Sequence, residues 1–224
     1  MTDPAADAAL AVPVWDLPIR LFHWALVVLV AFSWWSAENG RIGWHLWSGY
    51  AVLFLLLFRI LWGFLGSSTA RFATFLPTPR RLRDYLRDPS GWRGLGHTPL
   101  GALSVVALLG LLTLQVLFGL PLSDEDGVIA GPLNRLVSFD TAELAHDVHE
   151  ALFNVLLALI ALHVAAILYY RLRGKPLVRA MLSGRTVGAA GTAGMVAAPA
   201  SRLLLSLAIA AAITWWVASG LPGL

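Results

Sequence analysis

The chain has 224 residues, of which 58% are hydrophobic and only 13% are charged, and its formal net charge is +3. Soluble domains carry about 25% charged residues, so the composition excludes an ordinary soluble domain and predicts an integral membrane protein. The absence of cysteine excludes disulfides, cysteine-ligated iron–sulfur clusters and covalently attached c-type haem.

Five apolar segments follow one another along the chain and are expected to cross a bilayer as helices. In chain order they cover about residues 21–36, 44–66, 100–120, 145–170 and 203–219. The tail before the first segment lacks the positive charge of a signal peptide, so we expect this segment to be retained. The fold is therefore predicted to be an all-α integral membrane bundle.

The first four segments are expected to form one four-helix bundle, because a Gly/Ala-rich stretch separates them from the fifth. The fifth segment carries no histidine and is expected to stand apart. The predicted division is an N-terminal tail of residues 1–13, a four-helix domain of residues 14–182, a linker of residues 183–201 and a fifth transmembrane helix of residues 202–224.

The distribution of arginine and lysine between the connections predicts the orientation in the membrane. The 66–95 connection and the stretch after residue 170 hold most of them: Arg71, Arg80, Arg81, Arg83, Arg87, Arg93, Arg171, Arg173, Lys175, Arg179, Arg185 and Arg202. The two other connections hold only Arg41 and Arg135. Because basic loops stay cytoplasmic, the N-terminus is expected in the cytoplasm of a multi-pass inner-membrane protein, and no nucleic-acid partner is expected.

Four histidines are expected to lie at two matching depths in the membrane. His149 and His163 are fourteen residues apart in one apolar segment, which places them on nearly the same helix face and ~21 Å apart along it. His23 opens the first segment near the cytoplasmic side, and His45 opens the second near the outer side. Depth therefore pairs His45 with His149 and His23 with His163.

Paired histidines at two depths predict the axial ligands of two non-covalent b-type haems, which together would carry electrons across the membrane. For a single membrane histidine the alternative is an interhelical hydrogen bond. His146 is a rival ligand to His149, but its seventeen-residue separation from His163 rotates it by ~100° away from the face of His163.

The sequence around the histidines resembles a known family. The matching stretches are VWDLPIRLFHW at 14–24, HLWSGY at 45–50, FRILWGF at 58–64, GHTPLGA at 96–102 and HEALFN at 149–154. They resemble the prokaryotic cytochrome b561 family, which includes the b-type subunits of nickel–iron hydrogenases. The resemblance runs from about residue 14 to residue 181 and leaves the fifth helix outside.

The resemblance implies that four helices bind two b haems and that electrons pass between the quinone pool and a redox partner. It also implies that the haem ligands are His23, His45, His149 and His163, which agrees with the pairing by depth. The chain is then a quinone-linked oxidoreductase or an electron-transfer subunit. No catalytic triad, metal-hydrolase spacing or phosphate-binding loop argues for another chemistry.

Four further residues are candidate contacts to haem propionates or to a quinone, because these groups need cations or hydrogen-bond donors. They are Arg20, one turn before His23, Arg59, inside the apolar end of the second segment, Arg41, near the outer side, and His97, at the cytoplasmic mouth of the third. The alternatives are snorkelling for Arg59 and a plain helix-boundary residue for His97. A cytoplasmic quinone site is expected if Arg20, Arg59 and His97 converge.

The partners expected are membrane lipid, a quinone and a periplasmic cytochrome or oxidoreductase, and a homodimer is among the expected assemblies. An acidic outer loop that includes Asp124, Glu125 and Asp126 suits a basic cytochrome, although topology alone also depletes such a loop of basic residues. The alternatives are a membrane-anchoring subunit of a larger enzyme such as a hydrogenase, a superoxide:quinone oxidoreductase, and a haem-free transporter that relays protons through histidines.

Overall fold

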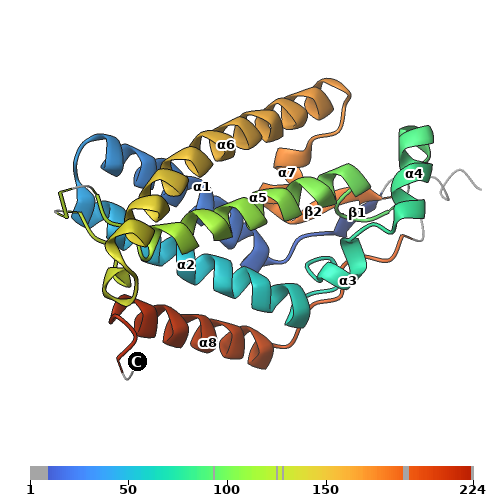
Figure 1. The fold of residues 1–224 in the computed structure, drawn as a ribbon. Coiled ribbons are helices and arrows are strands. Elements are labelled where there is room, and N and C mark those ends of the chain that lie inside the picture. Colours follow the sequence, from blue (N-terminus) through green and yellow to red (C-terminus); the bar gives the residue numbers. More distant parts are fainter. Residues whose placement is uncertain (1–9, 93, 125, 128, 189–191, 223–224) are drawn as a thin grey trace, which may run out of the picture.

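The computed structural model describes residues 10–92, 94–124, 126–127, 129–188 and 192–222. Arg93, Glu125, most of the predicted tail and the middle of the predicted linker lie outside these ranges. Within them, five helices are long and apolar enough to cross a membrane: α1 (Leu17–Glu38), α2 (Ile42–Leu65), α5 (Pro99–Gly119), α6 (Phe139–Leu172) and α8 (Ala200–Ala218). The all-α membrane bundle is therefore confirmed (Figure 1).

Capping residues decide where these helices begin. Asp16 accepts a hydrogen bond of 2.8 Å from the Ile19 N–H at the start of α1, and Thr98 accepts one of 3.1 Å from Gly101 at the start of α5. Ser138 caps α6, so this helix begins at Phe139 rather than near residue 145, where the apolar pattern starts. Polar residues thus extend α6 beyond the predicted span.

The helices form two antiparallel hairpins, α1–α2 and α5–α6, which meet where α2 packs on α5. Short helices and two strands gather at one end of the bundle: α3 (Phe72–Phe75), α4 (Pro79–Arg87), α7 (Leu177–Ser183), β1 (Leu10–Pro13) and β2 (Arg185–Gly188). We call this the basic end, because it includes the arginine-rich connections 66–98 and 173–199. The outer end holds the 39–41 and 120–138 connections.

The predicted tail and linker meet in a two-stranded sheet that the sequence did not indicate. β1 pairs antiparallel with β2, with Leu10 opposite Gly188 and Pro13 opposite Arg185. The Arg185 guanidinium also donates a hydrogen bond of 3.1 Å to the carbonyl of Ala11. This pairing fixes the segment that leads from the bundle to α8.

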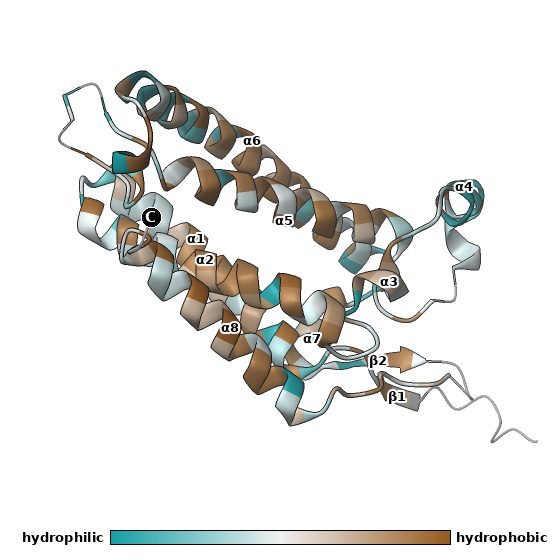
Figure 2. Cartoon of the chain, turned by 60° about the horizontal axis from the view of Figure 1, so that its bottom comes forward, coloured by the Kyte–Doolittle hydropathy of each residue, from teal (hydrophilic) through white to brown (hydrophobic). Residues whose placement is uncertain are grey.

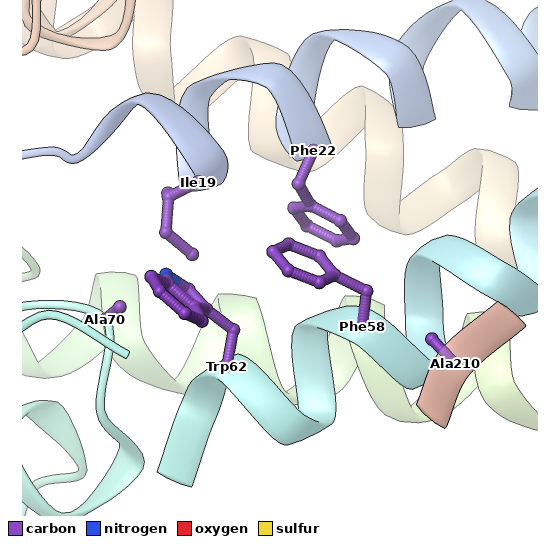
Figure 3. Close-up of a cluster of buried hydrophobic side chains, with 6 residues drawn as sticks. All are labelled: Ile19, Phe22, Phe58, Trp62, Ala70 and Ala210. Atoms are coloured by element: carbon purple, nitrogen blue, oxygen red, sulfur yellow. The ribbon is translucent and has the colours of Figure 1, made fainter. Parts of the chain in front are cut away.

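The fifth helix packs directly on α2 instead of standing away from the bundle. Its Ser206 and Ala210 are fully buried there, because small side chains let two helices approach closely. Ala210 joins a cluster in which Ile19 and Phe22 of α1 meet Phe58 and Trp62 of α2 (Figure 3). Figure 2 shows α8 beside the α1–α2 layer, with α5 and α6 on the other side of that layer.

A second buried cluster joins the two hairpins. It consists of Val52 and Leu56 of α2, Leu112 of α5 and Leu156 of α6. This cluster lies between the depth of His45 and His149 and the depth of His23 and His163, as expected from their positions along the helices. It therefore separates two candidate sites within one bundle.

Candidate functional site

His45 of α2 and His149 of α6 face each other near the outer end of the bundle. Their ring centroids are 6.1 Å apart and the ring planes are nearly perpendicular, at 85°. The two rings belong to different hairpins, which pack together where α2 meets α5. The structure thus brings together the pair that depth alone predicts.

Backbone carbonyls fix the orientation of both outer rings. Nδ1 of His45 lies 2.9 Å from the carbonyl oxygen of Ser33, and Nδ1 of His149 lies 2.8 Å from the carbonyl oxygen of Gln115. A carbonyl can only accept a hydrogen bond, so each Nδ1 carries the proton and donates it. Each neutral ring therefore keeps its lone pair on Nε2, the arrangement that histidine ligands of metals adopt.

Gly119 of α5 makes room for the His149 ring. A Cβ atom at position 119 would lie 3.0 Å from Cε1 and 3.2 Å from Nδ1 of His149. Gln115 lies one turn earlier on the same helix and holds the same ring through its carbonyl. Sequence reasoning missed Ser33, Gln115 and Gly119, because the first two act through backbone carbonyls that residue type does not mark.

His146 has different surroundings from His149. Its ring nitrogens lie 3.8 Å from a carboxylate oxygen of Asp147 and 3.8 Å from one of Glu150, and its side chain is 32% exposed. These carboxylates are themselves largely exposed, at 75% and 70%. His146 therefore belongs to the polar surface of the outer end, and the geometry favours His149 as the residue opposite His45.

His23 of α1 and His163 of α6 are the second predicted pair. The charge of His163 acts on His23. Nδ1 of His23 is buried and finds no hydrogen-bond partner among the described residues. The inner pair therefore lacks, at His23, the carbonyl contact that orients both outer rings.

Arg59 is a buried cation at the basic end of α2. Its side chain is only 3% exposed, and its guanidinium carbon lies 4.9 Å from the ring centroid of Phe72 and 5.8 Å from that of Phe75. The α2 residue Gly63 admits this arrangement, because a Cβ there would collide with the Phe72 ring. The charge of Asp16 acts on Arg59, so Arg59 is held inside the bundle rather than snorkelling outward.

Asp16 connects two elements of the basic end, α1 and α2. Besides capping α1 through Ile19, its other carboxylate oxygen accepts a hydrogen bond of 2.9 Å from the indole N–H of Trp62. The first helix is thus tied to the basic end of α2 next to Arg59. Asp16 is a positioning residue that sequence reasoning had not selected.

His97 lies between two aromatic rings at the start of α5. Its ring centroid is 4.6 Å from that of Trp15 and 4.9 Å from that of Phe75. Burial, with smaller contributions from the charges of Arg59 and His163, lowers the pKa of His97 to about 3. The ring is therefore neutral at physiological pH and lies near both the buried arginine and the inner histidine pair.

The other two predicted contact residues take different places. Arg20 donates a hydrogen bond to the backbone carbonyl of Leu182 in α7, whereas Arg59 and His97 share contacts with Phe75. Arg41 is exposed and precedes α2, where its carbonyl accepts the backbone N–H of His45 at 3.0 Å. Arg59 and His97 therefore form one group, with Arg20 directed to α7 and Arg41 at the outer end.

Three buried arginine nitrogens at the basic end lack hydrogen-bond partners in the part of the chain that the structure describes: Arg20 Nε, Arg59 Nη1 and Arg71 Nε. Buried donors without partners are costly, so a site that gathers several of them suits an acceptor-rich anionic ligand. The carboxylates of haem propionates have this chemistry.

Comparison with protein families decides between the classes of membrane protein that such a bundle allows. Residues 14–184 match the model of the prokaryotic cytochrome b561 family. The chain belongs to this family. Membership makes it a multi-pass membrane b-type cytochrome that transfers electrons. Searches of curated proteins and of solved structures give no match.

The matched region defines which elements are family elements. It begins next to β1 and ends at the C-terminus of α7, so it contains α1, α2, α5 and α6 with all six histidines. β2 and α8 follow it. The residues of the two histidine pairs fit b haems, because the outer rings leave Nε2 free and the basic end offers donors for propionates.

Proposed function

We propose that this cytochrome transfers electrons across the membrane through two b haems, between the quinone pool and a redox partner on the periplasmic side. The outer haem is held by His45 and His149, and the inner haem by His23 and His163. The observation that carries the proposal is the facing outer pair, in which both Nδ1 atoms donate to backbone carbonyls and both Nε2 atoms are left available.

Two haems at different depths suit electron transfer across the hydrocarbon core of the membrane, which is too thick for one haem to span. The hydrocarbon core is about 30 Å thick, and His149 and His163 are separated by roughly 21 Å along α6. Two histidine ligands for each iron would leave no place for a further ligand, so the chemistry that the haems would supply is outer-sphere electron transfer. The protein orients the outer rings through the carbonyls of Ser33 and Gln115.

The arginines support the proposed orientation in the membrane and the position proposed for the propionates of the inner haem. Buried Arg59, with Arg71 and Arg20 nearby in the same end, supplies donors for the propionates of the inner haem. The basic end then faces the cytoplasm by the positive-inside rule. The outer end, which carries exposed Asp140 and Asp147 and half-buried Glu143, faces the periplasmic partner.

Electron transfer across a sealed bilayer tests this function. Purified protein is reconstituted into liposomes with a short-chain quinol in the membrane and membrane-impermeant ferricyanide outside, and reduction of ferricyanide is followed. We expect the wild type and His146→Leu to support transfer, and His45→Leu and His163→Leu to lose most of it. Rates that stay unchanged in both ligand variants would contradict the proposed path.

A further inference from the structure

A cavity of about 220 Å³ lies at the basic end, outside the two histidine pairs. Its walls come from the 67–78 connection, from the segment before α5 and from residues 193–194. The lining residues used below are Thr74, Phe75, Arg81, Trp92, His97 and Gly194. Neither His23 nor His163 lines it, so this cavity is distinct from the inner haem site.

Two polar atoms of lining residues are buried and lack partners within the described ranges. They are the indole Nε1 of Trp92 and Nδ1 of His97. An indole N–H can only donate, and the neutral imidazole of His97 offers one donor and one acceptor. A ligand that satisfied both as donors would present at least two acceptor atoms.

The cavity has flat apolar walls beside these polar atoms. The Phe75 ring packs on His97, with centroids 4.9 Å apart, and the Arg81 guanidinium lies 5.8 Å from the centroid of the Trp92 indole. Aromatic side chains favour a planar guest that can stack or contact ring edges. Among the lining residues that the structure describes, Arg81 is the only cation, so these walls offer little of the charge that a polyphosphate requires.

The size and position of the cavity limit the class of ligand further. Sites for drug-sized ligands measure roughly 300–1,000 Å³, so about 220 Å³ suits a single substituted ring rather than a dinucleotide. The cavity adjoins Pro99 in the first turn of α5, where a spanning helix begins. Leu76 and Leu100, next to lining residues, are 41% and 45% exposed, which offers an apolar route to lipid.

Part of the cavity wall comes from residues beyond the family match. Ala193 and Gly194 line the cavity, while the matched region ends at residue 184. The Met195 N–H donates to the Pro13 carbonyl at 2.8 Å, and the Ser68 N–H donates to the Val196 carbonyl at 3.0 Å. These two hydrogen bonds fix the segment that leads to α8 against Pro13 and Ser68 at the basic end.

We propose that this cavity binds the ring of a membrane quinone, with the N–H groups of Trp92 and His97 donating to its two carbonyl oxygens and Phe75 contacting its face. The proposal rests on the proposed function and locates its quinone site. It also separates two roles, because Arg59 does not line the cavity and is left to the haem propionates. The proposal also gives α8 a function, because α8 anchors the segment whose residues 193–194 form part of the cavity wall.

Direct binding to the haem-loaded protein tests the site. Short-chain ubiquinone and short-chain menaquinone are titrated into detergent-purified protein by calorimetry. Trp92→Phe keeps an aromatic ring beside Arg81, although a smaller one, and removes the N–H, so we expect about five- to tenfold weaker binding. His97→Phe keeps a ring between Trp15 and Phe75 and should weaken binding similarly. Trp215→Phe, at a side chain of α8 that is 69% exposed, is the matched control.

Cross-linking and haem content separate the outcomes. An azido-quinone should label peptides that contain residues 74–77, 92–99 or 193–194. Unchanged affinity in Trp92→Phe and His97→Phe, or labelling only elsewhere, overturns this site while leaving a quinone function intact. A wild-type protein that holds both haems and binds neither quinone overturns the quinone function itself. Haem spectra of each variant show whether the fold is preserved.

Discussion

The carbonyl of Gln115 accepts a hydrogen bond of 2.8 Å from Nδ1 of His149. Gln115 lies on α5, which carries no proposed ligand, and His149 lies on α6. Packing between these two helices therefore sets the rotation of the ligand ring. Ser33 of α1 has the same relation to His45 of α2. In each hairpin, therefore, a backbone carbonyl of one helix orients the outer histidine of the other helix.

Gly119 should be intolerant of larger side chains because of this arrangement. In Gly119→Val, the added atoms would begin 3.0 Å from Cε1 of His149 and push the ring from its carbonyl contact. We expect haem content to fall toward roughly one per polypeptide, because a displaced ligand loses its orientation. The measurement is haem per protein after purification.

Gly110 provides the control for that variant. It lies on the same helix, and a Cβ there would meet nothing within 4 Å. Gly110→Val should retain the haem content of the wild type, because its side chain would meet no ligand ring. The two variants are matched, since both place a β-branched residue in α5. Equal haem loss in the two variants would mean that helix propensity, not the His149 ring, limits position 119.

Arg59 should raise the reduction potential of the inner haem. A buried positive charge favours the reduced iron, which carries one positive charge less than the oxidised iron. Arg59→Gln should therefore lower one of the two midpoint potentials by an amount on the order of tens of millivolts. A spectroscopic redox titration measures this, and exposed Arg41→Gln should shift either potential less. A rise in that midpoint potential on loss of Arg59 would contradict the placement of Arg59 beside the inner haem.

Asp16 should contribute to the stability of the basic end. Asp16→Ala removes the cap of Ile19 and the Trp62 contact and leaves Arg59 without the charge of Asp16. We expect a loss of about 1–3 kcal/mol in the free energy of unfolding, seen as a lower melting temperature in detergent. Asp147→Ala, at a side chain that is 75% exposed, should melt as the wild type does. Identical melting of the two variants would contradict the role of Asp16.

His97 should make stability depend on pH. Its pKa is about 3 in the folded protein and about 6.5 when unfolded, so the unfolded chain binds the extra proton between these values. The contribution of His97 is therefore complete above about pH 6.5 and is lost as the pH falls toward 3. His97→Phe should flatten the dependence of the melting temperature on pH between about pH 4 and pH 6.5. A wild-type melting temperature that rises on acidification would contradict this assignment.

The sequence predicts the five spans and the histidine pairing because both depend on local periodicity and on depth. Apolar runs define α1, α2, α5, α6 and α8, and rise per residue defines the levels of the histidines. The start of α6 is missed because a polar stretch after Ser138 continues the helix beyond lipid. The sheet is missed because residues 10–13 and 185–188 pair over a long separation that periodicity cannot reveal.

The contacts that orient the site are also non-local and use the backbone. The carbonyls of Ser33 and Gln115 act through any side chain that preserves the helix, so residue type does not mark them. The neighbourhood of Arg59 depends on Phe72 and Asp16, which lie on either side of α2 in the sequence. These residues become visible only when the hairpins are packed.

Haem content is the measurement that tests the central claim most directly. Haem per polypeptide is determined by pyridine haemochrome on detergent-purified protein, together with electron paramagnetic resonance of the oxidised form. Two low-spin b haems in the wild type are predicted, with one lost in His149→Leu and both kept in His146→Leu. A wild type with one haem or none, after expression with sufficient haem, would contradict the two-pair arrangement.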